Sequence, residues 1–165
     1  MGTRTALSLI LLLDQLPRNI YRTANKRLIF EHYDRLALAL LLSLLDDHTM
    51  AVRDTEPWVR RFDLHPRFIH HPVYRAWFYM PLVHSEHLPY HSLVSTFISS
   101  LLTDSQQAKD EAATKYMQAM RDIELQHAEI IERFGRYPYR NTVLGREWTE
   151  QERAWLEAGG NTFGS

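Results

Sequence analysis

The chain has 165 residues, and its 19 lysine and arginine residues nearly balance 20 aspartate and glutamate residues, for a formal net charge of −1. This balance excludes a generally basic protein, so we expect no nucleic-acid partner and no attraction to an anionic membrane surface. The absence of cysteine excludes disulfides, thiolate nucleophiles and cysteine-based zinc sites, and it favours a reducing, cytoplasmic compartment.

Two apolar runs have to be separated from membrane segments. Ala6–Leu13 resembles the core of a signal peptide, but Asp14 and Gln15 follow it and no small-residue cleavage site is present. Leu36–Leu45 has ten residues, which is about half the length of a bilayer-spanning helix. We therefore expect no membrane partner, and we assign both runs to core helices of a soluble protein. With 45% apolar residues, the whole chain 1–165 is expected to form one domain.

The first half of the chain predicts two helices and an irregular segment. The first helix covers about Thr5–Leu16 and ends at Pro17, because a proline disfavours helical geometry in the residue before it. The second covers about Asn25–Leu45, where apolar residues recur at spacings of three and four. From about 46 to 72 this pattern breaks up around several prolines, and we expect an irregular segment with a short helix near Trp58–Phe62.

The second half of the chain predicts four helices, which cover about Val73–Tyr79, Glu86–Leu102, Ala108–Arg133 and the segment after Thr149. Pro81 is expected to end the first of them, and the polar stretch 103–107 is expected to be a linker between the second and the third. Gly135 is placed to end the third helix in a left-handed conformation. Thr149 and Glu152 have the spacing of a capping box, which predicts the start of the last helix.

These elements predict an all-α fold. No segment of useful length alternates between apolar and polar residues as a strand does. About six helices with short connections are expected to form antiparallel helical hairpins, packed either as a bundle or as a tetratricopeptide-like array. The sequence shows no consensus repeat of the tetratricopeptide class, so the choice between bundle and array stays open.

The segment 133–146 concentrates positive charge in a near-neutral chain. Its four arginines are Arg133, Arg136, Arg140 and Arg146. A guanidinium group is a planar fork that stays charged at physiological pH and binds carboxylate or phosphate through two parallel hydrogen bonds. Facing arginines repel each other unless an anion lies between them. That anion is either a bound ligand or an internal carboxylate such as Asp14 or Glu86, in which case the arginines only tie helix ends together.

Other polar segments follow apolar helices, where a site is rigidly held yet reachable. The first contains Asp14, Gln15, Arg18 and Asn19, the second contains His84 and Glu86, and the third contributes His127. His84, Glu86 and His127 are candidate acid–base catalysts, because histidine titrates near neutrality and a neighbouring carboxylate orients it. The alternative is a hydrogen-bonded pair that only fastens a loop to the long helix.

Neither a metal nor another cofactor is predicted. His87 and His91 lie four residues apart and would share one face of a helix, which is half of a metal site. Because the chain has no cysteine and no evident third ligand, we expect the site to bind no metal.

Three blocks of the sequence, residues 11–22, 81–88 and 127–156, resemble the signature blocks of the domain of unknown function 924 family. The blocks span most of the chain in the family's order, and the third is long and specific. The resemblance implies an all-helical fold similar to tetratricopeptide arrays, and it brings no established activity. The family's polar signature falls on Asp14, Gln15, Pro17, Arg18, Asn19, His84, Ser85, Glu86, His127, Arg133, Gly135, Arg136, Pro138, Arg140, Asn141, Gly145 and Arg146.

Two departures from the family pattern bear on function. Tyr139 stands where the family usually has histidine, so the resemblance does not imply a histidine-dependent step at that position. Members also usually begin with a helical segment rich in tryptophan and phenylalanine, whereas this chain starts close to the first block. That difference predicts either an open groove or a shortened form.

Together these patterns favour a polar Arg/His/Glu pocket that binds a small anionic ligand carrying phosphate or carboxylate. The expected ligand contacts are Asp14, Gln15, Arg18, Asn19, Arg133, Arg136, Arg140 and Asn141, with His84, Glu86 and His127 as acid–base groups. The alternative is a tetratricopeptide-like interaction module whose groove takes a peptide or a partner helix. The sequence leaves open whether the protein is an enzyme, and it predicts no oligomeric state.

Overall fold

The computed structural model describes residues 3–45 and 62–164, and these residues form helices and turns with no strand among them. The helices of eight residues or more are α1 (Thr3–Ile20), α3 (Asp34–Leu45), α5 (Pro72–Val83), α6 (Leu88–Gln107), α7 (Glu111–Phe134) and α9 (Glu150–Glu157). Shorter elements are α2 (Lys26–Leu28), α8 (Asn141–Leu144), the π-helical turn η1 (Ile29–Tyr33) and the 3₁₀ turns η2 (Phe62–Leu64) and η3 (Pro138–Arg140). The prediction of an all-α fold is confirmed.

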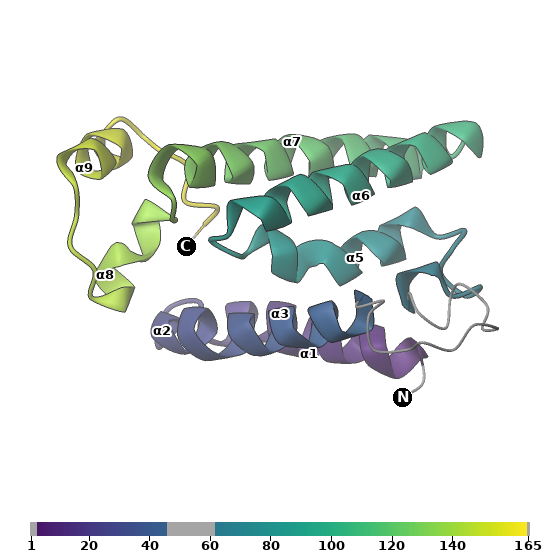
Figure 1. The fold of residues 1–165 in the computed structure, drawn as a ribbon, viewed down its shortest axis with the longest axis horizontal. Helices are drawn as coiled ribbons and strands as arrows, with labels where there is room; N and C mark the ends of the chain where they lie inside the picture. Colours follow the sequence, from purple (N-terminus) through teal and green to yellow (C-terminus); the bar gives the residue numbers. More distant parts are fainter. Residues whose placement is uncertain (1–2, 46–61, 165) are drawn as a thin grey trace.

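The long helices stack as neighbouring pairs (Figure 1). The hairpin of α6 and α7 packs on α5, and α5 in turn packs on the layer of α1 and α3. Apolar side chains from all five helices meet in one core, including Ile10, Leu41, Leu82, Ile98 and Met117, each at most 1% exposed. Fully burying one such side chain contributes roughly 1.5–3 kcal/mol, so this core holds the layers together.

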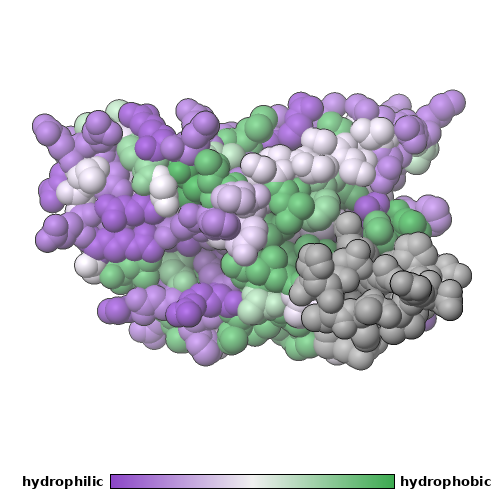
Figure 2. All heavy atoms as spheres, viewed as in Figure 1, coloured by the Kyte–Doolittle hydropathy of each residue, from purple (hydrophilic) through white to green (hydrophobic). Residues whose placement is uncertain are grey.

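The far end of the molecule, where α8 and α9 follow α7, is more polar than the body. Figure 2 shows hydrophilic residues over most of that end and apolar residues mainly near the middle of the same face. Among the described residues, no helix combines the length and the apolar character needed to cross a membrane.

The prediction that α1 ends at Pro17 is wrong, because the helix continues through it to Ile20. The turn around Pro17 is held by polar contacts: the side chain of Asn19 donates to the carbonyl of Gln15 at 3.0 Å. One turn apart on α1, Asp14 and Arg18 lie 3.6 Å from each other. Pro17 is also buried, and its neighbour Arg18 bonds Asp34 of α3 at 2.5 Å, so packing against other elements outweighs the local preference against a helix before proline.

Two more boundary predictions are wrong for related reasons. α5 includes Pro81, which is buried, and ends at Val83. The stretch 103–107, expected to be a linker, is the last part of α6. There the hydroxyl of Ser105 donates to the carbonyl of Leu101 at 2.7 Å, so a polar side chain is satisfied inside the helix.

The second predicted helix is present over Lys26–Leu45, but a π-helical turn interrupts it. The chain passes from α2 through η1 into α3 without leaving helical geometry. A π turn widens the helix by one residue and changes the direction in which its side chains project, often at functional sites. Here the turn places Phe30 near the end of α1 and leads directly into Asp34, which bonds Arg18 of α1.

The predicted C-terminal end of α7 and the predicted start of α9 are confirmed, whereas α7 begins at Glu111, three residues later than predicted. Gly135 ends α7 with φ +70°, a left-handed conformation that favours glycine. Thr149 and Glu152 form the reciprocal capping box at the start of α9. The short helix predicted near Trp58–Phe62 lies outside the described residues except for Phe62, which is in η2.

Candidate functional site

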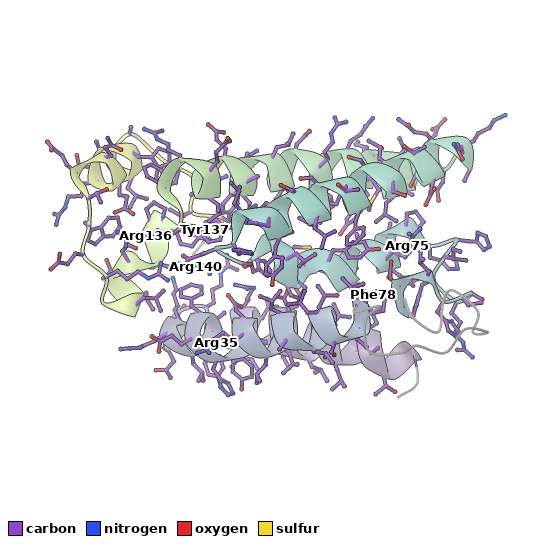
Figure 3. The ribbon with its side chains drawn as sticks, in the orientation of Figure 1. Arg35, Arg75, Phe78, Arg136, Tyr137 and Arg140 are labelled. Carbon is purple, nitrogen blue, oxygen red and sulfur yellow. The ribbon has the colours of Figure 1, made fainter. Side chains whose placement is uncertain are left out.

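The end of α1, the turn η1, the end of α5 and the segment 137–141 meet at one end of the bundle. Figure 3 shows Arg136, Tyr137 and Arg140 gathered there, with Arg140 directed toward the layer that contains α3. The centre of the junction is Asp14, whose side chain is fully buried. Its Oδ1 lies 2.7 Å from Nδ1 of His84, and its Oδ2 accepts a hydrogen bond from the Gln15 amide at 2.5 Å.

The environment of Asp14 fixes its charge and, with it, the tautomer of His84. Burial acts to raise the pKa of Asp14, but the hydrogen bond and charge of His84 and the charge of Arg18 outweigh it, so the pKa lies below its ordinary value. An ionised carboxylate only accepts hydrogen bonds. Nδ1 of His84 therefore carries the proton, and Nε2 carries a lone pair while the ring is neutral. Among the described residues Nε2 makes no hydrogen bond.

A second buried carboxylate, Asp34, joins two arginines and was not predicted from the sequence. Its Oδ1 bonds Arg18 at 2.5 Å, and its Oδ2 lies 3.6 Å from Arg140. The guanidinium of Arg140 also stacks on Phe30 and Tyr137, 4.6 and 4.4 Å from the ring centres. The available signal was its position: Asp34 lies three and seven residues before Ala37 and Leu41, on the buried face of α3, where an acid needs a charged partner.

Beside this junction lies a cavity of about 220 Å³, here called the main pocket. Its lining comprises Gln15, Arg18, Asn19, Arg22, Lys26, Ile29, Phe30, His84, His127, Tyr139, Phe163 and Gly164. Three of these side chains are cationic, and none of the described lining residues is acidic. Of the residues predicted to form a site, Gln15, Arg18, Asn19, His84 and His127 line this cavity. Arg22 and Lys26 also line it and were not among the predicted residues, because in the sequence they look like ordinary surface charges.

His127 also lines the main pocket, in a state that differs from that of His84. Burial lowers the pKa of His127 to about 3, against a smaller opposing effect of the hydrogen bond to the Ile123 carbonyl. Nδ1 donates that bond at 2.9 Å, and the ring stacks on Phe163 with the ring centres 3.5 Å apart. His127 is therefore neutral at physiological pH and serves as a wall of the pocket.

The structure does not bring every predicted residue into the main pocket. Glu86 forms a bidentate ion pair with Arg146 at 2.9 and 2.6 Å and accepts from the backbone of Tyr137. Arg133 is exposed and stacks on its neighbour Phe134. The side-chain amide of Asn141 donates a hydrogen bond to Oε2 of Glu152 on α9 at 3.3 Å. The contacts of Glu86 and Asn141 fit the alternative in which polar residues tie helix ends together, whereas the stacking contact of Arg133 is with its own helix.

Arg136 has the same supporting role, because its partner is Glu152 of α9. The two side chains form a bidentate pair at 2.7 and 2.9 Å, and Arg136 also donates to the Glu147 carbonyl. Hydrogen bonds from Arg136, then from Thr149 and the side chain of Asn141, lower the pKa of Glu152 to about 2 against the effect of burial. One carboxylate thus fastens the segment after α7 to the start of α9.

Glu152→Gln is expected to lower the free energy of unfolding by about 2–3 kcal/mol, because charge-assisted hydrogen bonds to Arg136 are lost. The carboxylate has a lowered pKa in the folded state, so its contribution is present above pH 4.5 and is lost as pH falls toward 2. Urea unfolding of both proteins between pH 7 and pH 2.5 checks this, with the exposed Glu150→Gln as control. A difference between Glu152→Gln and wild type that does not shrink on acidification would contradict the assignment.

A separate buried polar network supports the site from behind. His91 of α6 places Nδ1 2.9 Å from Oε1 of Glu124 of α7 and Nε2 2.9 Å from the carbonyl of Ser85. The hydroxyl of Tyr137 donates to the carbonyl of Val83 at 2.6 Å. Because Ser85 offers only an acceptor, Nε2 of His91 carries a proton, and one further proton lies between His91 and Glu124.

His87 and His91, whose spacing resembles half of a metal site, lie in different environments: His87 is exposed at the start of α6, whereas His91 is buried in the network. Within residues 3–45 and 62–164, no group of three or more His, Asp or Glu side chains is placed to hold a metal ion.

Comparison with known proteins gives a family but no activity. Residues 2–160 match the sequence profile of a family described as bacterial protein of unknown function (DUF924). A solved structure of a protein of unknown function from Agrobacterium tumefaciens is 24% identical and aligns with 95% of this chain and 69% of its own, with a TM-score of 0.48. No curated protein matches.

Proposed function

We propose that this chain, which belongs to the DUF924 family of bacterial proteins of unknown function, binds a small phosphate- or carboxylate-bearing ligand in the main pocket. The observation that carries the proposal is the lining of that pocket. Arg18, Arg22 and Lys26 border one cavity of about 220 Å³, and no described lining residue is acidic. A cavity bordered by cationic side chains attracts an anion, because the positive charges that no acid balances are stabilised when an anion binds between them.

The positive excess comes from Arg22 and Lys26. In the buried junction behind the pocket, the two carboxylates of Asp14 and Asp34 balance the two guanidinium groups of Arg18 and Arg140. Arg22 and Lys26 have no ion pair with a described acid, so they add two positive charges at the same cavity. An anion therefore gains two new partners without breaking an existing pair.

The remaining walls suit the uncharged part of a small ligand. Phe30, Tyr139 and Phe163 supply aromatic surface, and Gln15 and Asn19 supply amides that orient polar groups. Burial raises the pKa of Tyr139, so its phenol stays protonated and can donate a hydrogen bond. Tyrosine at this position thus fits binding, although it replaces the histidine usual in the family.

The residues predicted from the sequence to form the site fall into two groups, those that contact or support the ligand and those that do not. Gln15, Arg18, Asn19, His84 and His127 face the ligand in this proposal, and Asp14 and Arg140 act through neighbouring side chains. Among the other predicted residues, Glu86, Arg136 and Asn141 hold helix ends, and Arg133 is exposed on α7.

Removing the unpaired charges is expected to weaken binding about 10- to 100-fold. The variant is the double replacement Arg22→Gln and Lys26→Gln, which deletes two charge-assisted contacts to the ligand and leaves the buried ion pairs intact. Calorimetric titration with inorganic phosphate, pyrophosphate and citrate at constant ionic strength measures the effect. Lys115→Gln, at an exposed position on α7, is the matched control and is expected to bind as wild type does.

Two results would count against the proposal: no saturable binding of any of these anions to the wild-type protein, or equal affinity of the double variant. An acidic peptide that binds the wild type when the small anions do not would favour the second prediction from the sequence, an interaction module for a peptide or partner helix.

A further inference from the structure

The Asp14–His84 pair has the geometry of an oriented reactive histidine. Asp14 is fully buried, holds Nδ1 of His84 at 2.7 Å and keeps the lone pair on Nε2. The His84 side chain is 13% exposed, which leaves the ring reachable without letting it rotate freely in solvent. It lines the main pocket and also a smaller cavity of about 140 Å³ on the side of Asp34 and Ser85.

No other described lining residue of the main pocket offers a comparable nucleophile. The lining contains no serine, threonine, cysteine or carboxylate. Tyr139 stays protonated because burial disfavours the phenolate. His127 is fixed between the Ile123 carbonyl and Phe163, and its buried environment disfavours the cation that forms when an imidazole attacks an electrophile.

His84 differs from His127 because its hydrogen-bond partner, the carboxylate of Asp14, balances the positive charge of the imidazolium. A carboxylate at Nδ1 stabilises the imidazolium that forms as Nε2 reacts. The cationic side chains of Arg18, Arg22 and Lys26 lie around the same cavity, where they would neutralise the oxygens of a phosphoryl group during transfer. The pocket thus combines an oriented nucleophile with positive groups for the transferring group.

We propose that the main pocket is a phosphoryl-transfer site in which Nε2 of His84 accepts the phosphoryl group of a phosphate monoester or similar small phosphoryl donor. The inference rests on the proposed anion site and adds a reaction to it. Asp14 is a positioning residue, and His84 is the catalytic residue that bonds to phosphorus.

The step balances without a cofactor. The lone pair of Nε2 forms the N–P bond while the bond from phosphorus to the leaving oxygen breaks, and that oxygen takes the electron pair and then a proton from solvent. Nδ1 keeps its proton and its bond to Asp14. Water then attacks phosphorus, the N–P bond breaks, its electrons return to Nε2, and inorganic phosphate leaves while the proton of water passes to solvent.

The test is direct detection of phosphohistidine. The whole protein is incubated with phosphoramidate, a small donor whose leaving group is ammonia, and labelled residues are identified by tandem mass spectrometry and by ³¹P nuclear magnetic resonance. We expect the Nε2 isomer at His84, formed about 100-fold faster than at exposed His87, because oriented positive groups accelerate the step. His87 serves as the control for unassisted chemistry within the same molecule.

Two variants separate positioning from folding. Asp14→Asn is expected to slow labelling of His84 by about 100-fold and to let the Nδ1 isomer appear, which loss of stability alone would not cause. Arg22→Gln with Lys26→Gln is expected to slow labelling by about 10-fold and to leave the isomer unchanged. Circular dichroism of each variant confirms its helical content.

Labelling of His84 no faster than His87, or only on Nδ1, would overturn the phosphoryl-transfer site. If phosphate still binds the wild type with an affinity that depends on Arg22 and Lys26, anion binding stands and only the reaction fails. If phosphate does not bind at all, both proposals fail. Hydrolysis of a phosphate monoester without a phosphorylated His84 would also overturn the phosphoryl-transfer proposal. In that case His84 would act as a general base on water and would not bond to phosphorus.

Discussion

Replacement of Asp34 by alanine is expected to lower the free energy of unfolding by about 3–5 kcal/mol. Asp34 is the carboxylate shared by Arg18 and Arg140, at 2.5 and 3.6 Å. Arg140 is only 4% exposed and has no other described carboxylate within 4 Å, so the variant leaves a buried guanidinium without its ion pair. The stacked rings of Phe30 and Tyr137 do not replace a full negative charge.

Urea unfolding followed by circular dichroism measures this effect. Asp122→Ala is the matched control, because Asp122 is exposed on α7 and its ion pair among the described residues is with the neighbouring Arg121 at 3.7 Å. That control is expected to change stability by less than about 0.5 kcal/mol. Combining Asp34→Ala with Arg140→Met should recover part of the loss, since an apolar side chain tolerates the aromatic surroundings. A loss below about 1 kcal/mol in Asp34→Ala would show that the pairs contribute little.

Replacement of His91 by alanine is expected to cost about 3–5 kcal/mol at neutral pH, because Glu124 loses its hydrogen-bond partner. Glu124 is 1% exposed. Burial raises its pKa, and the hydrogen bond and charge of His91 oppose that rise. In the variant the opposing effect is gone, so the pKa of Glu124 rises further and the folded state favours the protonated acid.

The sign of the pH dependence follows from that raised pKa. A buried acid whose pKa is higher in the folded state destabilises the fold as pH rises above its ordinary value of 4.5. The difference between His91→Ala and wild type should therefore grow from pH 4.5 to pH 8 when measured by urea unfolding. The double variant His91→Ala with Glu124→Gln is expected to lose this growth, since no ionisable group is left in the pair. A constant difference for His91→Ala across this range would contradict the assignment.

The sequence was sufficient for the parts of the fold that depend on local chemistry. The helical class follows from apolar spacing, and the capping box of Thr149 and Glu152 and the terminating Gly135 are set by neighbouring backbone groups. The helices continue through Pro17 and Pro81, and both residues are buried in the packed bundle. Packing, which the local preference against a helix before proline does not include, decides the conformation there.

The site was predicted less completely, because the partners of long charged side chains depend on tertiary structure. Within the arginine-rich segment, Arg136 pairs with Glu152 and Arg146 with Glu86, whereas Arg140 turns inward to Asp34. Nothing in the local sequence indicates which carboxylate each arginine pairs with. Arg22 and Lys26 were missed for the same reason: only the position of η1 beside the end of α1 makes them walls of one cavity.

The tetratricopeptide-like arrangement implied by the family resemblance stays a prediction. The assignment of particular residues to a ligand site also stays a prediction. What the packing does support is that polar groups from distant parts of the sequence meet: Asp14 and His84, 70 residues apart, are joined by a hydrogen bond of 2.7 Å. That contact fixes the tautomer on which the proposed chemistry depends.

The most direct test of anion binding in the main pocket is a crystal structure of the wild-type protein grown without phosphate or sulfate and soaked in tungstate, a heavy analogue of phosphate. We expect one ordered tungstate in the main pocket, within hydrogen-bonding distance of Arg22, Lys26 and Nε2 of His84. The same soak of the Arg22→Gln and Lys26→Gln double variant should leave that position empty. Tungstate ordered only at exposed arginines such as Arg133, with none in the main pocket of the wild type, would contradict the proposal.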